Sequence, residues 1–298
     1  MKSFSFSLVR PTAAVALMGA LLAGCATAPS PESGLREQVV AVTTSHELIT
    51  FHAGQPERIL ERRPVTGLPA GERLVGIDFR VARGVLYALS QAGRLYTLDI
   101  PTGALRPVGP APAVVGLRGT AFGFDFNPVA DRIRVVSNTG QNLRLHPDTG
   151  AAVDGDPAVE GVQPDPTLRY AWSDTNAGRA PDIAGAAYTY NTQDSKITTN
   201  YAIDRALGVL VMQGSREGTT PVVSPNTGHL RTVGPLGLPP LIDVAFDISD
   251  VGNVALIAVR TSADSQTRLH LVDLRTGAAK PLGKVGEGAP LLGMAIEP

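Results

Sequence analysis

The sequence contains few of the residues on which several classes of protein depend. Its 298 residues include one Cys and one Trp, and aromatic residues make up only 5%. A single Cys cannot form an internal disulfide bond. Basic and acidic residues nearly balance, at 26 and 27, so the chain lacks the positive excess of nucleic-acid-binding proteins. Long amphipathic helical patterns are also missing beyond the first two dozen residues.

Several catalytic signatures are missing as well. The sequence has no GxSxG nucleophile elbow, no GxxxxGK(S/T) phosphate-binding loop and no HExxH zinc motif. Its five His residues contain no pair at the spacing of a helical zinc site. The single Cys falls in a lipid-attachment pattern, which removes it as a catalytic nucleophile. We therefore expect a binding or structural protein in preference to an enzyme.

The N-terminus has the pattern of a bacterial lipoprotein signal. Lys2 and Arg10 supply positive charge, and the apolar run that follows ends in Leu-Ala-Gly-Cys, with the Cys at position 25. This pattern resembles the lipobox, where a peptidase cuts before a Cys that carries the lipid; an ordinary secretory signal is the alternative. We predict a signal peptide over residues 1–24, lipidation of Cys25 and a flexible tether over residues 25–37.

The predicted lipid attachment indicates the cellular location of the protein. A diacylglycerol on the thiol and an N-linked acyl chain such as palmitate would anchor it firmly, because one chain alone binds a membrane only marginally. Ala26, rather than Asp, follows the Cys, and this favours sorting to the outer membrane. We expect a lipid-anchored monomer of the cell envelope, with an envelope protein or a glycan as its partner and no nucleic acid.

The mature sequence is built from repeats. Gly (32) and Pro (24) are frequent, which favours short strands separated by turns. Four segments share a Thr-Gly turn, in which Gly accepts positive φ and a polar residue bonds the backbone. The turn glycines lie at intervals of 47, 78 and 49 residues, and they are Gly103, Gly150, Gly228 and Gly277.

A second shared segment precedes each turn, and a fifth copy ends the sequence. The copies are LVGIDF, AFGFDF, IAGAAY, LIDVAF and LLGMAI, which begin at Leu74, Ala121, Ile183, Leu241 and Leu291. Residues between the LVGIDF-like segment and the Thr-Gly turn alternate or run apolar, which is typical of strands. With the segments on either side, each repeat is predicted to contain four short strands. Four-stranded repeats of roughly 40–50 residues are typical of β-propeller blades.

The two ends of this region are complementary. Residues 38–65 contain three predicted strands without a first strand, whereas LLGMAI is a first strand without the other three. We predict an all-β, five-bladed β-propeller over residues 38–298, with four antiparallel strands per blade. The ring is closed by the C-terminal strand joining the N-terminal strands. A sixth blade, hidden in an insertion at residues 154–182, is the alternative.

The insertion is the first candidate for a binding loop, because loops this long are usually functional or disordered. Tyr170 and Trp172 are candidates for stacking on a sugar or a peptide, or they hold the loop against the ring. Asp174, Asn176 and Asp182 resemble part of a calcium loop, with a hydrogen-bonded turn as the alternative. Calcium is the one cofactor that the sequence suggests, and no other is predicted.

Two acidic residues occupy the same repeat position. Asp78 in GIDF and Asp125 in GFDF fall on the predicted innermost strand, so both should lie near the axis. Arg80 and Asn127, two residues on, face the same way. These four residues are candidate ligand-binding groups, and the carboxylates could also hold a metal. The alternative is that each Asp bonds a neighbouring backbone and joins one blade to the next.

The sequence resembles a family of bacterial secreted proteins, the domain-of-unknown-function family 4394. The resemblance covers residues 38–298 and rests on stretches such as LVGIDFR, GFDFNPVADRIRVVSNTGQNLR, SDTNAG and TTNYAID. It implies a propeller-like fold and brings no activity or catalytic residue with it.

Three functions remain open at this stage. The first is binding or scaffolding in the cell envelope, which rests on fold-level analogy. The second is a metal-dependent hydrolase of the lactonase or esterase kind that uses axial carboxylates. The third is a purely structural role in a membrane assembly. Acidic residues at most of the first-strand positions would favour the hydrolase, and only two of five positions have one.

Overall fold

The structure is a computed structural model that describes residues 1–3, 34–109 and 116–298. The chain divides into two compact units, residues 1–30 and 31–298, and every named strand belongs to the second. Residues 4–24 of the predicted signal peptide, Cys25 and residues 26–33 of the predicted tether lie outside the described residues. Within the described part of the chain, no helix is long and apolar enough to cross a membrane.

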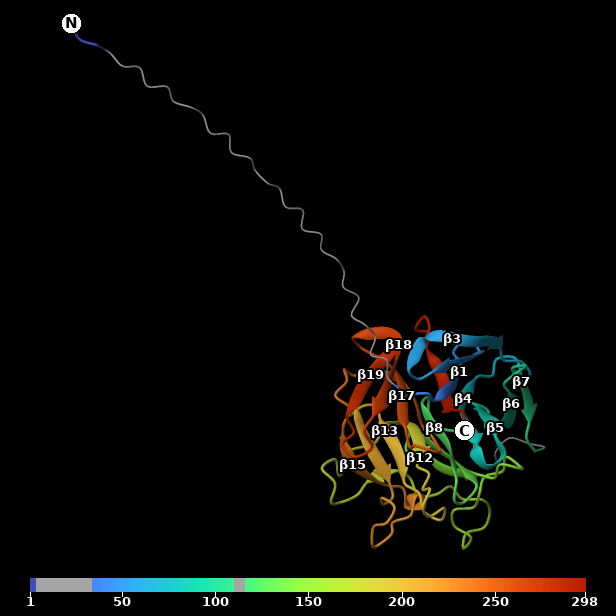
Figure 1. The fold of residues 1–298 in the computed structure, drawn as a ribbon. Helices are drawn as coiled ribbons and strands as arrows, with labels where there is room; N and C mark the ends of the chain where they lie inside the picture. The colour runs from blue at the N-terminus through green and yellow to red at the C-terminus, as the bar shows by residue number, and fades with distance from the viewer. Residues whose placement is uncertain (4–33, 110–115) are drawn as a thin grey trace. The chain divides into compact units, whose positions relative to one another are not determined.

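The second unit is a ring of five β-sheets (Figure 1). The first blade holds β4 (Leu74–Arg80), β5 (Val85–Ser90), β6 (Leu95–Asp99) and β7 (Ala104–Pro107). The second holds β8 (Phe122–Asn127), β9 (Arg132–Ser137) and β10 (Asn142–Leu145). The fourth holds β16 (Leu241–Ile248), β17 (Ala255–Thr261), β18 (Asp264–Val272) and β19 (Ala279–Lys284).

The third blade has five strands and the last is composite. The third holds β12 (Ile183–Tyr188), β13 (Asn200–Asp204), β14 (Val209–Gln213), β15 (His229–Pro235) and β11 (Arg169–Tyr170). The composite blade holds β20 (Leu291–Ile296), β1 (Gln38–Thr43), β2 (Glu47–His52) and β3 (Gln55–Pro64). Two short 3-10 helices complete the described elements, η1 (Val81–Arg83) and η2 (Pro225–Thr227).

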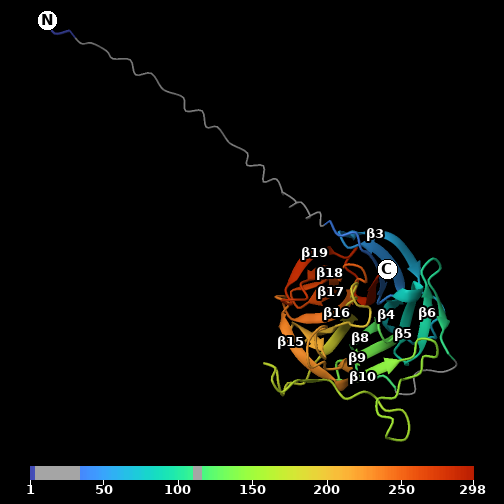
Figure 2. The same cartoon turned by 60° about the horizontal axis from the view of Figure 1, so that its bottom comes forward.

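The five LVGIDF-like segments are the innermost strands, as predicted. Figure 2 shows β4, β8 and β16 near the middle of the ring and β3 and β19 at its periphery. Glycine lets these strands approach closely: a Cβ on Gly123 would lie 2.5 Å from the Ala186 nitrogen of the next blade. The four turn glycines all have positive φ, between 70° and 84°, which confirms the turns predicted from the repeats.

The composite blade confirms the predicted closure. β20 pairs antiparallel with β1, with Val39 opposite Ile296 and Ala41 opposite Met294. Both faces of the blade are covered: Val39 and Met294 join an apolar cluster with the fourth blade, and Val40 and Ala295 join one with the first blade. Burial on both faces explains why the first and last strands form one sheet.

The prediction of four strands in every blade was wrong for two blades. After β10 the chain makes only one bridge, Leu145 opposite Ala152, and then leaves the second blade. It returns as β11, which pairs parallel to the outer edge of β15 in the third blade. The insertion therefore borders an existing blade, and the described residues form five sheets with no sixth.

Candidate functional site

Three buried carboxylates meet at the axis of the ring, and we call Asp78, Asp125 and Asp247 the axial carboxylate cluster. They come from β4, β8 and β16, and their side-chain oxygens can all lie within 4.8 Å of one another. The residues are 6%, 4% and 4% exposed. The sequence predicted that Asp78 and Asp125 would approach the axis, and the structure brings them together with a third acid.

Each of these carboxylates also joins two blades. Asp78 Oδ2 accepts a hydrogen bond of 2.7 Å from the Phe126 amide, and Asp125 Oδ1 accepts one of 3.0 Å from the Tyr188 amide. Asp247 Oδ2 accepts one of 2.6 Å from the Ile296 amide of β20. The backbone bonding that was the alternative for Asp78 and Asp125 is therefore present, alongside a cluster able to hold a ligand.

The cluster has an unusual electrostatic state. Burial raises the pKa of Asp247 from 3.8 to about 7. Burial also raises the pKa of Asp78 and of Asp125 well above 3.8, and the charge of the neighbouring carboxylates adds to the rise. Among the described residues, no Lys, Arg or His donates a hydrogen bond to the three. Protons or a bound cation must therefore supply the balancing charge.

A cavity of about 390 Å³ adjoins the cluster, and we call it the Tyr190 pocket. Its lining includes Arg80, Val81, Phe126, Asn127, Tyr190 and Ile197. Phe126 follows Asp125 directly, and Arg80 lies two residues after Asp78. Burial raises the pKa of Tyr190, and the charges of all three axial carboxylates raise it further. Tyr190 therefore lies near the cluster and keeps its hydroxyl proton.

Arg80 and Asn127 line this pocket, and most of their polar atoms bond within the protein. Arg80 forms ion pairs with Asp131 at 2.5 Å and Asp148 at 2.6 Å. Asn127 Oδ1 accepts hydrogen bonds from the amides of Val129 and Ala130 and so caps the turn after β8. The Asn127 amide nitrogen and the Tyr190 hydroxyl remain as donors for a ligand.

The aromatic pair of the insertion is separated. Tyr170 is buried, and its hydroxyl donates a hydrogen bond of 2.7 Å to Asp204 Oδ2 in the third blade. Trp172 is 89% exposed. β11 ends at Tyr170, and the next residues form a turn closed by the Asp174 amide donating to the Ala171 carbonyl. The turn directs Trp172 away from Tyr170, so one ring holds the loop and the other faces solvent.

The three residues of the calcium-like pattern each have another partner. Asp174 Oδ2 accepts a hydrogen bond of 2.6 Å from the Thr232 amide, and Asn176 donates to the Thr232 hydroxyl. Asp182 forms an ion pair with Arg205. Within the described ranges, the axial carboxylate cluster is the group of three or more His, Cys, Asp or Glu residues placed to share a metal.

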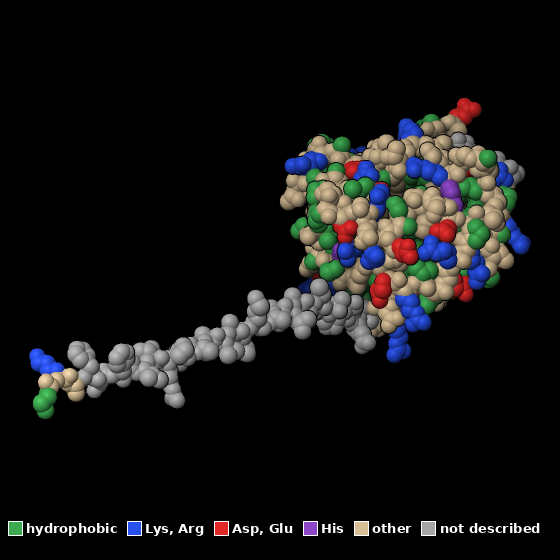
Figure 3. All heavy atoms as spheres, turned by 90° about the horizontal axis from the view of Figure 1, so that it is seen from above, with side chains coloured by type: hydrophobic (Ala, Val, Ile, Leu, Met, Phe, Trp, Pro, Cys, Tyr) green, Lys and Arg blue, Asp and Glu red, His purple; other side chains and the backbone are tan. Residues whose placement is uncertain are grey.

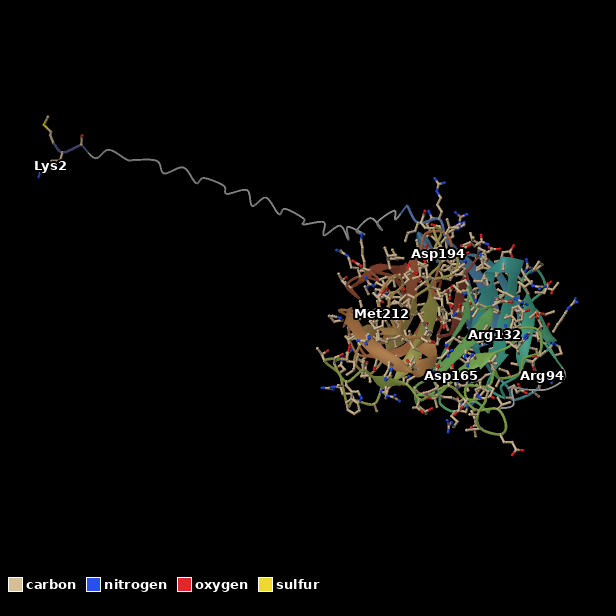
Figure 4. The ribbon with its side chains drawn as sticks, turned by 90° about the horizontal axis from the view of Figure 1, so that it is seen from below. Lys2, Arg94, Arg132, Asp165, Asp194 and Met212 are labelled. Carbon is tan, nitrogen blue, oxygen red and sulfur yellow. The ribbon has the colours of Figure 1, made fainter. Side chains whose placement is uncertain are left out.

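A second buried polar group was not predicted, and we call it the Arg134 cluster: Arg134, Asn142, Arg144, Asp165 and Asn226. Arg134 donates to Asp165 at 2.6 Å and to Asn142 at 2.8 Å, and Arg144 also pairs with Asp165 at 2.7 Å. Asp165, labelled in Figure 4, belongs to the insertion, and its two Arg partners lie on β9 and β10 of the second blade. It fixes the insertion to the ring.

The fold and the axial cluster together define a class, the five-bladed β-propellers with a buried acidic centre. The chain belongs to the family DUF4394, a domain of unknown function, whose family model matches residues 47–295. This confirms the resemblance noted in the sequence. No curated protein matches the chain.

Solved structures that match the chain have very different sequences. The nidogen/laminin complex matches at 13% identity, with 88% of this chain and 98% of that chain covered and a TM-score of 0.48. Hydrazine synthase of Kuenenia stuttgartiensis matches at 12% identity, 77% and 53% coverage and a TM-score of 0.40. YCF48 bound to D1 peptide matches at 10% identity, 83% and 64% coverage and a TM-score of 0.36. Identities this low carry no functional argument.

Proposed function

We propose that this protein is a binding protein of the bacterial cell envelope, anchored by lipid on Cys25, with the Tyr190 pocket as its ligand site. One observation carries the proposal: a cavity of about 390 Å³ lies beside three buried carboxylates at the axis. Arg80 and Asn127, both candidates from the sequence, line this cavity, and Asp78 and Asp125 lie beside it. Pockets of this size that combine apolar walls with a few polar groups are typical ligand sites.

The chemistry of the pocket defines the ligand class. Val81, Phe126 and Ile197 provide apolar contact, and the protonated Tyr190 hydroxyl provides a hydrogen-bond donor. The ligand is a compact, mainly apolar molecule or side chain with a hydrogen-bond acceptor. The face shown in Figure 3 carries Lys and Arg side chains interspersed with Asp and Glu side chains.

A blocked pocket tests the binding proposal. Ala82 lines the pocket, and Ala263 is an exposed alanine of the fourth blade, between β17 and β18 and outside the lining. Full-length wild type, Ala82→Trp and Ala263→Trp would be purified from the native envelope and examined by native mass spectrometry. We expect a bound molecule in wild type and Ala263→Trp but not in Ala82→Trp. Equal occupancy in all three, or none in any, would contradict the proposal.

The lipid anchor has its own test. Cys25→Ala removes the thiol that would accept the diacylglycerol, so the protein should move from the membrane fraction to the soluble fraction. Cell fractionation followed by immunoblotting measures this. Ala26→Asp is the matched variant, which should keep the protein membrane-bound and shift it to the inner membrane. Retention of Cys25→Ala in the membrane would show that another feature anchors the chain.

A second candidate function is metal-dependent hydrolysis of the lactonase or esterase kind. Asp247 favours it, because a third acid completes a set of oxygen ligands that a divalent cation could use. We rank it second because all three carboxylates are buried. Metal analysis of the purified protein, with hydrolysis of phenyl acetate in calcium and in EDTA, distinguishes the two. A stoichiometric metal and EDTA-sensitive turnover that Asp125→Asn abolishes would favour the hydrolase.

A further inference from the structure

A second cavity lies at the other end of the axis, where the innermost strands begin. It has a volume of about 200 Å³, and all five blades contribute to its walls. Residues 73–75 line this cavity and residues 80–82 line the Tyr190 pocket, so the two sites lie at opposite ends of β4. An inference about this cavity is therefore independent of the proposed function.

Three guanidinium groups from three different blades converge on this cavity, which we call the arginine mouth. Arg73 precedes β4, Arg205 follows β13 and Arg260 lies on β17. Arg205 is held by Asp182 through bonds of 2.9 and 3.0 Å, and Arg260 donates to Asp243 at 2.6 Å. These ion pairs fix two of the guanidinium groups and offset their charge.

Arg73 differs from the other two, because its hydrogen-bond partner among the described residues is neutral. Its Nε donates a hydrogen bond of 2.9 Å to Gln91 Oε1. This bond orients the guanidinium group without cancelling its charge, and it uses only the Nε donor. One uncompensated positive charge therefore remains at the mouth, on a group whose planar fork suits bidentate oxyanion recognition.

The remaining groups of the mouth limit the shape of a ligand. Thr120 Oγ1 accepts from Asn138 Nδ2 at 3.3 Å, which leaves the hydroxyl proton of Thr120 for a ligand oxygen. Leu74, Phe122 and Leu292 form apolar walls. Deeper along the axis lies a smaller cavity of about 20 Å³, which has room for a single water molecule. A ligand must therefore enter from the mouth and have a short apolar part.

The charges along the axis also set the orientation of a ligand. The axial carboxylate cluster lies at the far ends of the innermost strands and disfavours an anion there. An anionic head group is stabilised at Arg73 instead. We infer that the arginine mouth is a binding site for a small oxyanion, a carboxylate or a phosphate ester, with a short apolar group directed into the ring.

Calorimetric titration of the full-length protein tests this site with defined probes. Butanoate and butyl phosphate carry the two head groups, and butan-1-ol and butylammonium are the neutral and cationic controls. We expect one or both anions to bind at least tenfold more tightly than either control, and the tighter anion identifies the head group. Equal affinity for anions and controls, or no binding of the anions, would overturn the inference.

Matched variants locate the binding to the mouth. Arg73→Gln removes the uncompensated charge and should lower the anion affinity at least tenfold, whereas Thr120→Val should lower it a few-fold. Arg83→Gln is the control, since Arg83 is an exposed Arg of the first blade outside the mouth. Melting curves of all variants check that the ring is folded, and Thr120→Val provides a second test should Arg73→Gln unfold. Unchanged affinity in folded Arg73→Gln or Thr120→Val overturns the inference.

Discussion

The axial carboxylate cluster and the Arg134 cluster both hold buried charged groups, but only in the Arg134 cluster does each ionised group have a partner of opposite charge. Asp165 is paired with two Arg residues there, and Asn142 and Asn226 accept from the same guanidinium group as Asp165. In the axial cluster, three acids meet and accept hydrogen bonds from backbone amides. The buried carboxylate of the Arg134 cluster is therefore neutralised by the chain, whereas the axial cluster needs a proton or a cation.

This difference separates a structural group from a candidate functional one. A satisfied buried ion pair fixes one arrangement of the chain, here the path of the insertion between two blades. A buried cluster of like charges instead needs protons or a cation to neutralise it, so its state depends on pH and on the ions in solution. The four predictions below test this contrast, and the largest expected effect comes first.

Removing Pro290–Pro298 should have the largest effect. It deletes β20, exposes the apolar residues of β1 and takes the Ile296 amide away from Asp247. We expect a loss of more than about 5 kcal/mol in the free energy of unfolding, or no cooperative transition, measured by urea denaturation. Deleting Pro298 alone is the control and should change little. A truncated protein as stable as wild type would contradict closure by β20.

Arg134→Met should have the next largest effect. It leaves the buried Asp165 with Arg144 alone and removes the donor to Asn142, so we expect a loss of about 3–5 kcal/mol in stability. Arg144→Met should cost less, because Arg134 still balances Asp165. The double variant Arg134→Met/Asp165→Leu should recover much of the loss. Equal losses in the two single variants would show that the cluster does not act as described.

The axial cluster should make stability depend on pH. The pKa of Asp247 is raised in the folded state to about 7, so folded protein retains a proton that unfolded protein loses above about 4. The stabilisation is complete below that pH and is lost as the pH rises through about 7. In EDTA, urea denaturation should show a fall of roughly 2–4 kcal/mol over this range.

Two comparisons test whether Asp247 causes this fall in the free energy of unfolding as the pH rises. Asp247→Asn should flatten the profile between pH 4 and 7, and the exposed control Asp194→Asn should follow wild type. Calcium should also flatten it if the cluster holds a cation, because a bound cation replaces the proton. A wild-type profile without this slope in EDTA would contradict the raised pKa.

The two aromatic residues of the insertion should show the smallest effects. Tyr170→Phe removes a buried hydrogen bond to Asp204, and we expect a loss of about 1–2 kcal/mol. Trp172→Ala changes an exposed side chain and should stay within about 0.5 kcal/mol of wild type. Thermal melting compares both. A larger loss for Trp172→Ala than for Tyr170→Phe would mean that the insertion is held differently.

The repeats made most of the fold predictable, because the turn and the innermost strand recur with the same local chemistry in each blade. The three-stranded second blade was not predictable in this way. Residues 151–153 carry a strand-like pattern, but the path of the chain depends on Asp165 reaching Arg134, a contact between residues far apart in the sequence.

The axial site was predictable only in part. Asp78 and Asp125 share a repeat position, so aligning the repeats finds them. Asp247 was missed because LIDVAF aligns the fourth repeat two residues out of register. In the structure, Ala245 rather than Asp243 lines the axis together with Gly76 and Gly123, so Asp247 lies at the level of Asp78 and Asp125. Aligning VAFDI of the fourth repeat with VGIDF of the first is the signal that would have found Asp247.

The pairing of β20 with β1 also affects the order in which the ring forms during synthesis. A ribosome makes β1 to β3 before β4 to β19 and makes β20 after them, so three strands of the composite blade lack their partner while residues 65–290 are made. Blades one to four can form as the chain emerges, at about 5–20 residues per second, but the ring stays open until β20 appears. Emergence of β20, rather than formation of any single blade, is therefore the event that commits this ring to its final shape.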